Sequence, residues 1–137
     1  MIELTPIDNG SDGHDLEIGQ RILLSSKGPR TKQFIARRDG LEIGFVSMDE
    51  LPEIDCLALC ELFISKRLRG SGLGRLLLEA VEARAREQGY EWVTLSPWPL
   101  ESSFAVERLV AWYRKQGYAE RIGRPTELEK RIVLSLR

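Results

Sequence analysis

The chain of 137 residues carries 20 basic and 21 acidic side chains, for a formal net charge of −1. This length suits one domain, and this charge argues against a general nucleic-acid binder. No apolar run approaches the roughly 18 residues of a membrane helix, and the first residues lack the basic and apolar regions of a signal peptide. Two cysteines cannot build a disulfide framework, and one histidine leaves little for a metal site. We therefore expect a single cytoplasmic domain over residues 1–137, with free thiols, no metal ion, and neither nucleic acid nor membrane as partner.

The first third of the sequence predicts a strand, a short helix and a hairpin. IELTPI (2–7) is expected to form a short strand, and HDLEIGQRILLS (14–25) a short helix between two loops. QFIARRDG (33–40) and LEIGFVSMDE (41–50) indicate two strands joined by an Asp-Gly turn. That combination is a strong short-range signal for a β-hairpin.

The middle third predicts a central strand followed by a helix. CLALCELFIS (56–65) is nearly continuous in apolar residues and suits a strand buried on both faces. Cys56 and Cys60 are expected to pack there as small hydrophobes. After Gly72, apolar residues recur at helical spacing, and Gly89 is well placed to end that helix.

The last third predicts a strand, a helix and two closing strands. EWVTLS (91–96) is the strand, and the prolines that follow it cannot continue a central strand. SSFAVERLVAWYRKQG (102–117) has a serine to cap a helix and a terminal glycine to stop it. YAERI (118–122) and LEKRIVLSL (128–136) are expected to be strands separated by a Gly-Pro loop. This order of elements predicts an α/β fold with helices layered on a mixed β-sheet.

The stretch RLRGSGLGRLLLEA (67–80) places three alternating glycines between the central strand and its helix. Glycines let the backbone approach a ligand, and the free N–H groups and dipole of a helix start attract an anion. Two familiar phosphate loops do not fit. Gly74 is followed by Arg75-Leu76 instead of Lys-Ser/Thr, and Leu77 replaces the third glycine of the dinucleotide fingerprint. Taken alone, this stretch supports a phosphate cradle and a plain tight turn equally.

The wider pattern resembles the GCN5-related N-acetyltransferases (GNAT). Arg69-Gly70-Ser71-Gly72-Leu73-Gly74 matches the Arg/Gln-x-x-Gly-x-Gly/Ala signature of that family. Leu59, Leu62 and Ile64 stand where the family keeps apolar residues, and Leu59 and Leu62 can share a face only across a β-bulge. Trp112-Tyr113-Arg114-Lys115-Gln116-Gly117-Tyr118 resembles the family's Leu-Tyr-x-Lys-x-Gly-Phe segment. The resemblance implies the GNAT fold, with splayed parallel strands at the cofactor site and a shortened N-terminal helical region.

The resemblance covers about residues 33–136 and implies how acetyl-CoA would bind. The molecule would lie between strands 59–65 and 91–96, with its pyrophosphate on the backbone N–H groups of loop 70–74. Its pantetheine would pair with the backbone of the first strand. The residues expected to bind it are Phe63, Ile64, Ser65, Arg69, Gly70, Ser71, Gly72, Leu73, Gly74 and Arg75. Glycine is expected in the loop for its lack of bulk, and the arginines are expected to tune the local field.

Acetyl transfer to an amine of pKa about 10.4 requires loss of a proton from the amine and is helped by an acid at the leaving thiolate. Tyr113 matches the family tyrosine that usually supplies the acid; the alternative is that it only packs its helix on the sheet. Glu61 is the only carboxylate inside the central strand, so it is either a base or substrate contact, or a salt-bridged or edge-facing glutamate. Thr94 stands where some relatives carry a glutamate, and a water relay without a dedicated base is a third route.

Three features depart from the family pattern. Val106 replaces an asparagine that often contacts the pantetheine, and the connection after strand 91–96 is longer than usual. The N-terminal part is short, so the acceptor pocket would be open or completed by a second copy in a homodimer. Trp98 and Phe104 are expected either to wall the acceptor site or to cover the edge of the core.

The resemblance predicts an acetyl-CoA-dependent N-acetyltransferase. It would transfer an acetyl group to a primary amine of a small molecule or protein, by direct attack in a ternary complex. The alternative is a non-catalytic module that binds acyl-CoA or serves a partner protein, because a fold does not fix a function.

Overall fold

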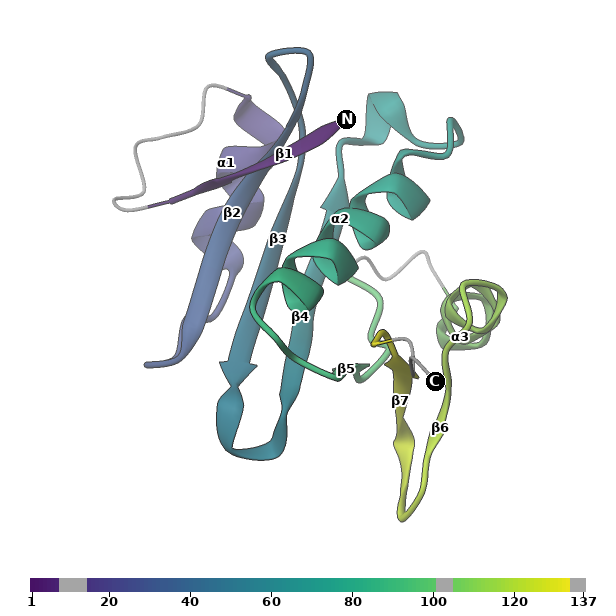
Figure 1. The fold of residues 1–137 in the computed structure, drawn as a ribbon. Coiled ribbons are helices and arrows are strands. Elements are labelled where there is room, and N and C mark those ends of the chain that lie inside the picture. The colour runs from purple at the N-terminus through teal and green to yellow at the C-terminus, as the bar shows by residue number, and fades with distance from the viewer. Residues whose placement is uncertain (8–14, 101–104, 134–137) are drawn as a thin grey trace.

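The computed structural model describes residues 1–7, 15–100 and 105–133 (Figure 1). Within these residues the chain forms seven strands and three α-helices. In chain order they are β1 (Ile2–Pro6), α1 (Leu16–Leu24), β2 (Thr31–Arg38), β3 (Leu41–Leu51), β4 (Cys56–Ile64), α2 (Leu73–Glu87), β5 (Trp92–Leu95), α3 (Val106–Lys115), β6 (Ala119–Arg121) and β7 (Arg124–Arg131). The predicted α/β class is confirmed.

All strands belong to one mixed sheet in the order β1-β2-β3-β4-β5-β7-β6. Neighbours are antiparallel, except that β4 and β5 run parallel. Parallel neighbours need a crossover, and α2 provides it. The parallel pair lies at the centre of the sheet, so the C-terminal ends of β4 and β5 lie at the same edge of the sheet.

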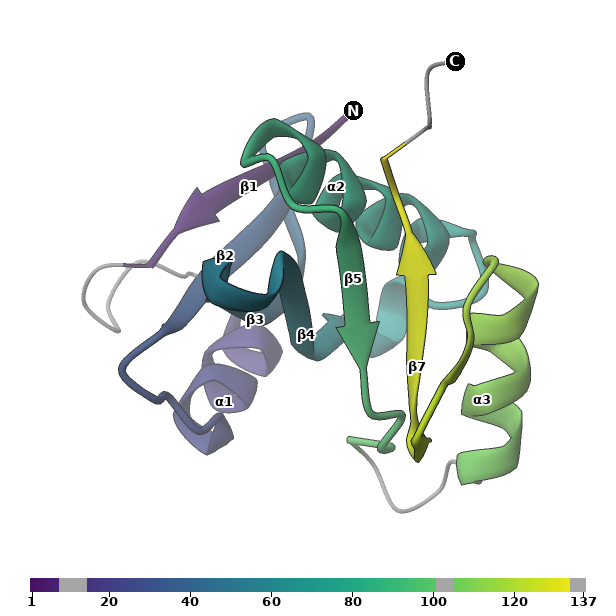
Figure 2. The same cartoon turned by 60° about the horizontal axis from the view of Figure 1, so that its bottom comes forward.

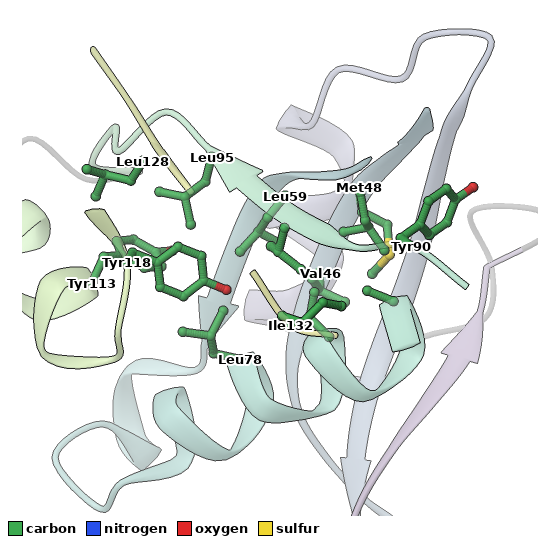
Figure 3. Packing of buried hydrophobic residues seen from close by; sticks show 14 of the residues in the cluster. Val46, Met48, Leu59, Leu78, Tyr90, Leu95, Tyr113, Tyr118, Leu128 and Ile132 are labelled. Atoms are coloured by element: carbon green, nitrogen blue, oxygen red, sulfur yellow. The ribbon is translucent and has the colours of Figure 1, made fainter. Parts of the chain in front are cut away.

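The helices divide unequally between the two faces of the sheet. Helices α2 and α3 cover one face, and α1 alone lies on the other (Figure 2). The larger core lies under α2 and α3, and its cluster includes Leu78 of α2, Leu59 of β4 and Leu95 of β5 (Figure 3). A smaller cluster lies under α1, built around Ile18, Phe45 and Phe63.

Local signals in the sequence account for several boundaries. Asp39 and Gly40 have φ angles of 53° and 80°, which a tight turn between β2 and β3 requires. The Asp15 carboxylate accepts a hydrogen bond from the backbone N–H of Ile18 and caps α1. Gly89 follows the end of α2, as the sequence predicts.

Two predicted boundaries are wrong. Helix α3 begins at Val106, behind Ala105, which supplies no side-chain cap. The predicted serine cap falls in residues 101–104, outside the described part of the chain. Strand β7 begins at Arg124 and includes Pro125, which the sequence places in a loop. The β6–β7 register shifts between Glu120 and Arg121, so Pro125 lies where the strand has no ladder partner in β6.

Of the helices in the described ranges, none combines the length and the apolar character needed to cross a membrane.

Candidate active site

Strands β4 and β5 separate partway along their length. Their pairing runs from Cys56 opposite Trp92 to Leu59 opposite Leu95 and stops there. Strand β4 continues to Ile64, whereas β5 ends. The second half of β4 therefore has an unpaired edge, which confirms the predicted splay.

A β-bulge in β4 coincides with the point of separation. Glu61 lies opposite Ser47 and Leu59 lies opposite Met48, so Cys60 is the extra residue. Because of the bulge, Leu62 packs on the same side of the sheet as Leu59, the side that α2 covers. The three-residue spacing of these two leucines predicts this bulge.

The expectation that Cys60 packs in the core is wrong, although it holds for Cys56. The bulge turns Cys60 out of the alternation and leaves its side chain exposed. Partial loss of hydration, together with the nearby Asp49 carboxylate, raises the pKa of the Cys60 thiol to about 11. The thiol therefore stays protonated at neutral pH and is a poor nucleophile.

A pocket of about 560 Å³ opens where the strands part. Four segments that are far apart in the sequence line it: the second half of β4, the loop and helix start at 69–75, residues 95–100, and α3. Ten of the twelve residues predicted for the site line this pocket: Glu61, Phe63, Ile64, Arg69, Gly70, Gly72, Leu73, Gly74, Arg75 and Tyr113. The other two, Ser65 and Ser71, do not.

The glycine loop presents an uncapped helix start to the pocket. Gly70 and Gly72 have φ angles of 83° and 82°, a conformation that other residues rarely adopt. Gly72 is the N-cap of α2 and no side chain caps the helix. The first-turn N–H groups of Leu73, Gly74 and Arg75 have no acceptor within the helix, so they are suited to an anion.

The conformation of the loop itself accounts for two of the three glycines. A Cβ on Gly70 or Gly72 would meet no atom within 4 Å. A Cβ on Gly74 would lie 3.5 Å from the Trp112 ring of α3, which is an ordinary van der Waals distance. Backbone conformation therefore favours glycine at positions 70 and 72, and the lack of bulk toward a bound pyrophosphate stays a prediction for all three glycines.

The arginines of the loop hold it in place. The Arg69 Nε donates to the Ile64 carbonyl at 2.9 Å, and its guanidinium lies 5.3 Å from the centre of the Phe63 ring. Arg67 pairs with Asp15 of the α1 cap at 2.6 Å, and the half-exposed Arg75 pairs with Glu79 at 3.0 Å. The contacts of Arg69 and Arg67 fix the loop against β4 and the start of α1, whereas the Arg75 pair lies within α2.

The backbone of β4 alternates between its two edges. The Ser65 N–H donates to the Ile43 carbonyl of β3, so Ser65 is directed away from the open edge. In an antiparallel pair the next residue faces the opposite edge, so Leu62 and Ile64 direct their backbone groups toward the side that β5 vacates. Among the three residues predicted to pair with the pantetheine, Ile64 is best placed, and Leu62 was not foreseen.

Tyr113 is buried in α3 and reaches both the core and the pocket. Its ring makes edge contacts with Trp112 at 4.9 Å and with Tyr118 at 5.8 Å. Burial raises the pKa of Tyr113 above its ordinary value, so the hydroxyl stays protonated at every pH of interest. The structure thus gives Tyr113 a packing role and makes it a lining residue of the pocket, while its role as a donor to the leaving sulfur stays a prediction.

Glu61 is held by helix α1. Arg21 Nη2 lies 3.2 Å from one carboxylate oxygen, and the Ser25 hydroxyl donates to the other. Gln33 of β2 donates to Ser25 at 3.2 Å. This arrangement corresponds to the salt-bridged interpretation of Glu61, while the position of Glu61 in the pocket wall keeps its role as a base a prediction.

Several pocket residues were not predicted from the sequence. Arg108, Leu109 and Trp112 line the pocket from α3, and only their helical spacing from Tyr113 could have indicated them. Trp98 is 76% exposed at the rim, so it does not cover the core. Phe104, the other predicted wall residue, lies outside the described residues.

Comparison with known proteins agrees with this geometry. Residues 29–120 match the Acetyltransferase (GNAT) domain. An IAA acetyltransferase from Azospirillum brasilense is 33% identical over 93 residues, which span 68% of this chain and 58% of that protein. The chain therefore matches less than two thirds of that relative's length.

Solved structures share the fold at low identity. The ribosomal-protein-S18-alanine N-acetyltransferase of Escherichia coli has a TM-score of 0.65 and 18% identity, covering 98% of this chain and 96% of that one. A GNAT acetyltransferase from Elizabethkingia anophelis, with acetyl-CoA bound, has a TM-score of 0.63 and 14% identity over 95% and 97% of the two chains. Together with the splayed strands and the uncapped helix start, these matches show that the chain belongs to the GNAT acetyltransferase family.

Proposed function

We propose that the protein is an N-acetyltransferase that moves an acetyl group from acetyl-CoA to a primary amine. One observation supports this most directly: the open edge of β4, the uncapped start of α2 and the Tyr113 side chain all meet in one pocket. Family membership supports the same reaction. The acceptor is a primary amine of a small molecule or a protein.

The residues present fit acetyl-CoA as the donor. First-turn N–H groups of Leu73, Gly74 and Arg75 suit the pyrophosphate. The edge of β4 at Leu62 and Ile64 suits an added strand-like partner such as the pantetheine amides. The apolar walls formed by Leu59, Leu95, Leu109 and Trp112 suit the uncharged arm and acyl group.

The reaction is a direct acyl transfer. The amine nitrogen forms a bond to the thioester carbonyl carbon, and the carbon–sulfur bond breaks. Glu61, directly or through water, accepts the proton that the amine loses, and the Tyr113 hydroxyl donates a hydrogen bond to the departing sulfur. Direct attack needs both substrates bound together, so we propose a ternary complex.

A second candidate is a module that binds acyl-CoA without turnover. The observation that favours it is that Glu61 already forms an ion pair with Arg21 and accepts a hydrogen bond from Ser25. A carboxylate held in this way is less available as a base. Val106 in place of the family asparagine points the same way. This module would share the donor pocket and lack a base.

Two measurements on the full chain separate these functions. Isothermal calorimetry with acetyl-CoA tests the donor pocket, and we expect micromolar or tighter binding. Release of coenzyme A is then followed with a thiol reagent across a panel of small amines, amino acids and peptides, with mass spectrometry of the products. Binding and amine-dependent release support the enzyme, and binding with no transfer supports the module. Absence of binding overturns both.

A further inference from the structure

The outward side of helix α1 is unusually apolar for a surface helix. Leu16, Leu23 and Leu24 are 85%, 83% and 73% exposed, although the helix has only nine residues. Ile18, on the opposite side, is fully buried against the sheet. A surface helix normally pairs one apolar side with one polar side, and an all-round apolar helix is normally covered.

The charged residues of α1 are directed toward its own chain. Arg21 pairs with Glu61, the Glu17 carboxylate accepts the Lys66 N–H at 3.0 and 3.1 Å, and the cap residue Asp15 pairs with Arg67. At 100° per residue, Leu16, Gly19, Gln20 and Leu23 share the outer side, with Leu24 at its margin. We name these five residues the leucine face; none of them carries a charge.

No helix or strand of the described residues packs on the leucine face, and Figure 2 shows α1 alone on its side of the sheet. The two exposed leucines at the ends are 85% and 83% accessible, and a Cβ on Gly19 would meet no atom within 4 Å. Among residues 1–7, 15–100 and 105–133, the leucine face is therefore left uncovered.

We propose that the leucine face binds the same face of a second copy of this chain, with the two α1 helices antiparallel. The sequence of the face is self-complementary about its midpoint. When paired residue numbers add to 39, Leu16 of one copy meets Leu23 of the other, and Gly19 meets Gln20. This is the reciprocal contact that a two-fold axis requires.

The chemistry of the face suits a second copy. A net charge of −1 and an uncharged face give no repulsion between copies. Gly19 has no side chain, so the opposing helix can approach closely at the crossing point. A nine-residue helix supplies only part of the roughly 800 Å² per partner of a standard interface, so we expect a dissociation constant in the micromolar range.

The contact would also bear on the pocket. Arg21 of α1 and Ser25, the residue that follows its last turn, both contact Glu61. A second copy on the outer side would confine α1 between the sheet and its counterpart.

Sedimentation velocity tests the proposal over a concentration series from about 1 to about 200 μM. The unmodified chain should shift from monomer to dimer, and Leu23→Glu should weaken the association at least tenfold. Ile122→Glu, at a 96% exposed residue of the β6–β7 turn, is the matched control and should associate normally. Thermal melts verify that each variant folds. A chain that stays monomeric throughout, or a Leu23→Glu variant that dimerises as before, overturns the proposal.

Cross-linking tests the register independently. In a Cys60→Ser background, Gln20→Cys should give a disulfide-linked dimer on mild oxidation, because residue 20 lies next to the two-fold axis. Glu79→Cys, on the exposed side of α2, should give none. Equal cross-linking at both positions would contradict the antiparallel α1 contact.

Discussion

The two faces of the sheet are built in different ways: one packs the larger core and the other holds a largely buried ion pair. Under α2 and α3 lies the larger core, which continues into the walls of the pocket through Leu59, Leu95 and Tyr113. Under α1 lies a small apolar cluster beside a polar group made of Arg21, Ser25 and Glu61. The α2 face thus combines the packing of the core with the walls of the pocket, and the α1 face adds the charged partner of one pocket residue, Glu61.

The largest effect is expected at the start of α2. Gly72→Val should abolish acetyl-CoA binding in calorimetry, because a β-branched residue at φ 82° forces the loop to rearrange and moves the N–H groups of α2. The strain itself should cost about 1–3 kcal/mol of unfolding free energy.

Gly40→Val is the matched control for that change. Gly40 has φ 80° and open space around a Cβ, but it lies in the β2–β3 turn. It should lose similar stability and keep its affinity for acetyl-CoA. If both variants lose affinity in proportion to their melting temperatures, the loop is only a turn.

Two tyrosines on the α2 side of the sheet test whether catalysis and stability depend on different residues. Tyr113→Phe should lower kcat about 100-fold with unchanged affinity for acetyl-CoA, because the donor to the sulfur is lost. Tyr118→Phe should leave kcat unchanged and lower the unfolding free energy by about 1–3 kcal/mol. The Tyr118 hydroxyl donates to buried Glu82 at 2.9 Å, and Lys130 is the remaining partner of that carboxylate.

Steady-state kinetics and thermal melts on the same preparations give both readouts. An unchanged kcat in Tyr113→Phe would restrict that residue to packing. A lower kcat in both variants would mean that the aromatic cluster acts through structure alone.

Much of the α2 face could be predicted from the sequence because its signals are local. Three glycines before a helical apolar pattern indicate the loop, and the parity of Leu59 and Leu62 predicts the bulge. The position of the bulge residue did not follow, so the exposure of Cys60 was missed. A bulge moves one residue to the other side of a strand, and the alternation of apolar residues alone does not show which residue that is.

The contacts of the α1 face could not be predicted in the same way. Arg21 and Glu61 are forty residues apart, and neither residue has a local pattern that names the other. The sequence does show that a carboxylate inside the central strand needs a partner. A salt bridge is therefore one of the two interpretations that the sequence offers for Glu61. Which arginine supplies it depends on how α1 crosses the sheet, and that is a tertiary property.

The polar group of the α1 face should contribute a moderate amount to stability. Arg21→Met leaves Glu61, whose side chain is only 12% exposed, without its counter-charge, so we expect a loss of about 1–3 kcal/mol in chemical denaturation. The double variant Arg21→Met/Glu61→Gln should recover part of that loss. Arg75→Met breaks a pair whose side chains are 55% and 54% exposed, and should cost less than about 0.5 kcal/mol. Equal losses at Arg21 and Arg75, with no recovery in the double variant, would show that the pair is not coupled.

A smaller effect than that of Arg21→Met is expected at Glu50, a carboxylate that links α2 to the β2–β3 hairpin. Burial disfavours the ionised Glu50 carboxylate, but hydrogen bonds and charge from Lys32 and Arg84 outweigh this and lower its pKa from the ordinary 4.5. Because the folded chain keeps this carboxylate ionised to a lower pH than the unfolded chain does, its contribution is complete above pH 4.5 and is lost as the pH falls through the lower folded value. Glu50→Gln should therefore be about 1 kcal/mol less stable than the unmodified chain at pH 7, and the gap should close as the pH falls below 4. Urea denaturation at stepped pH measures it, and a gap that persists unchanged to pH 3 would mean that side-chain shape at this position, and not its charge, stabilises the contact between α2 and the hairpin.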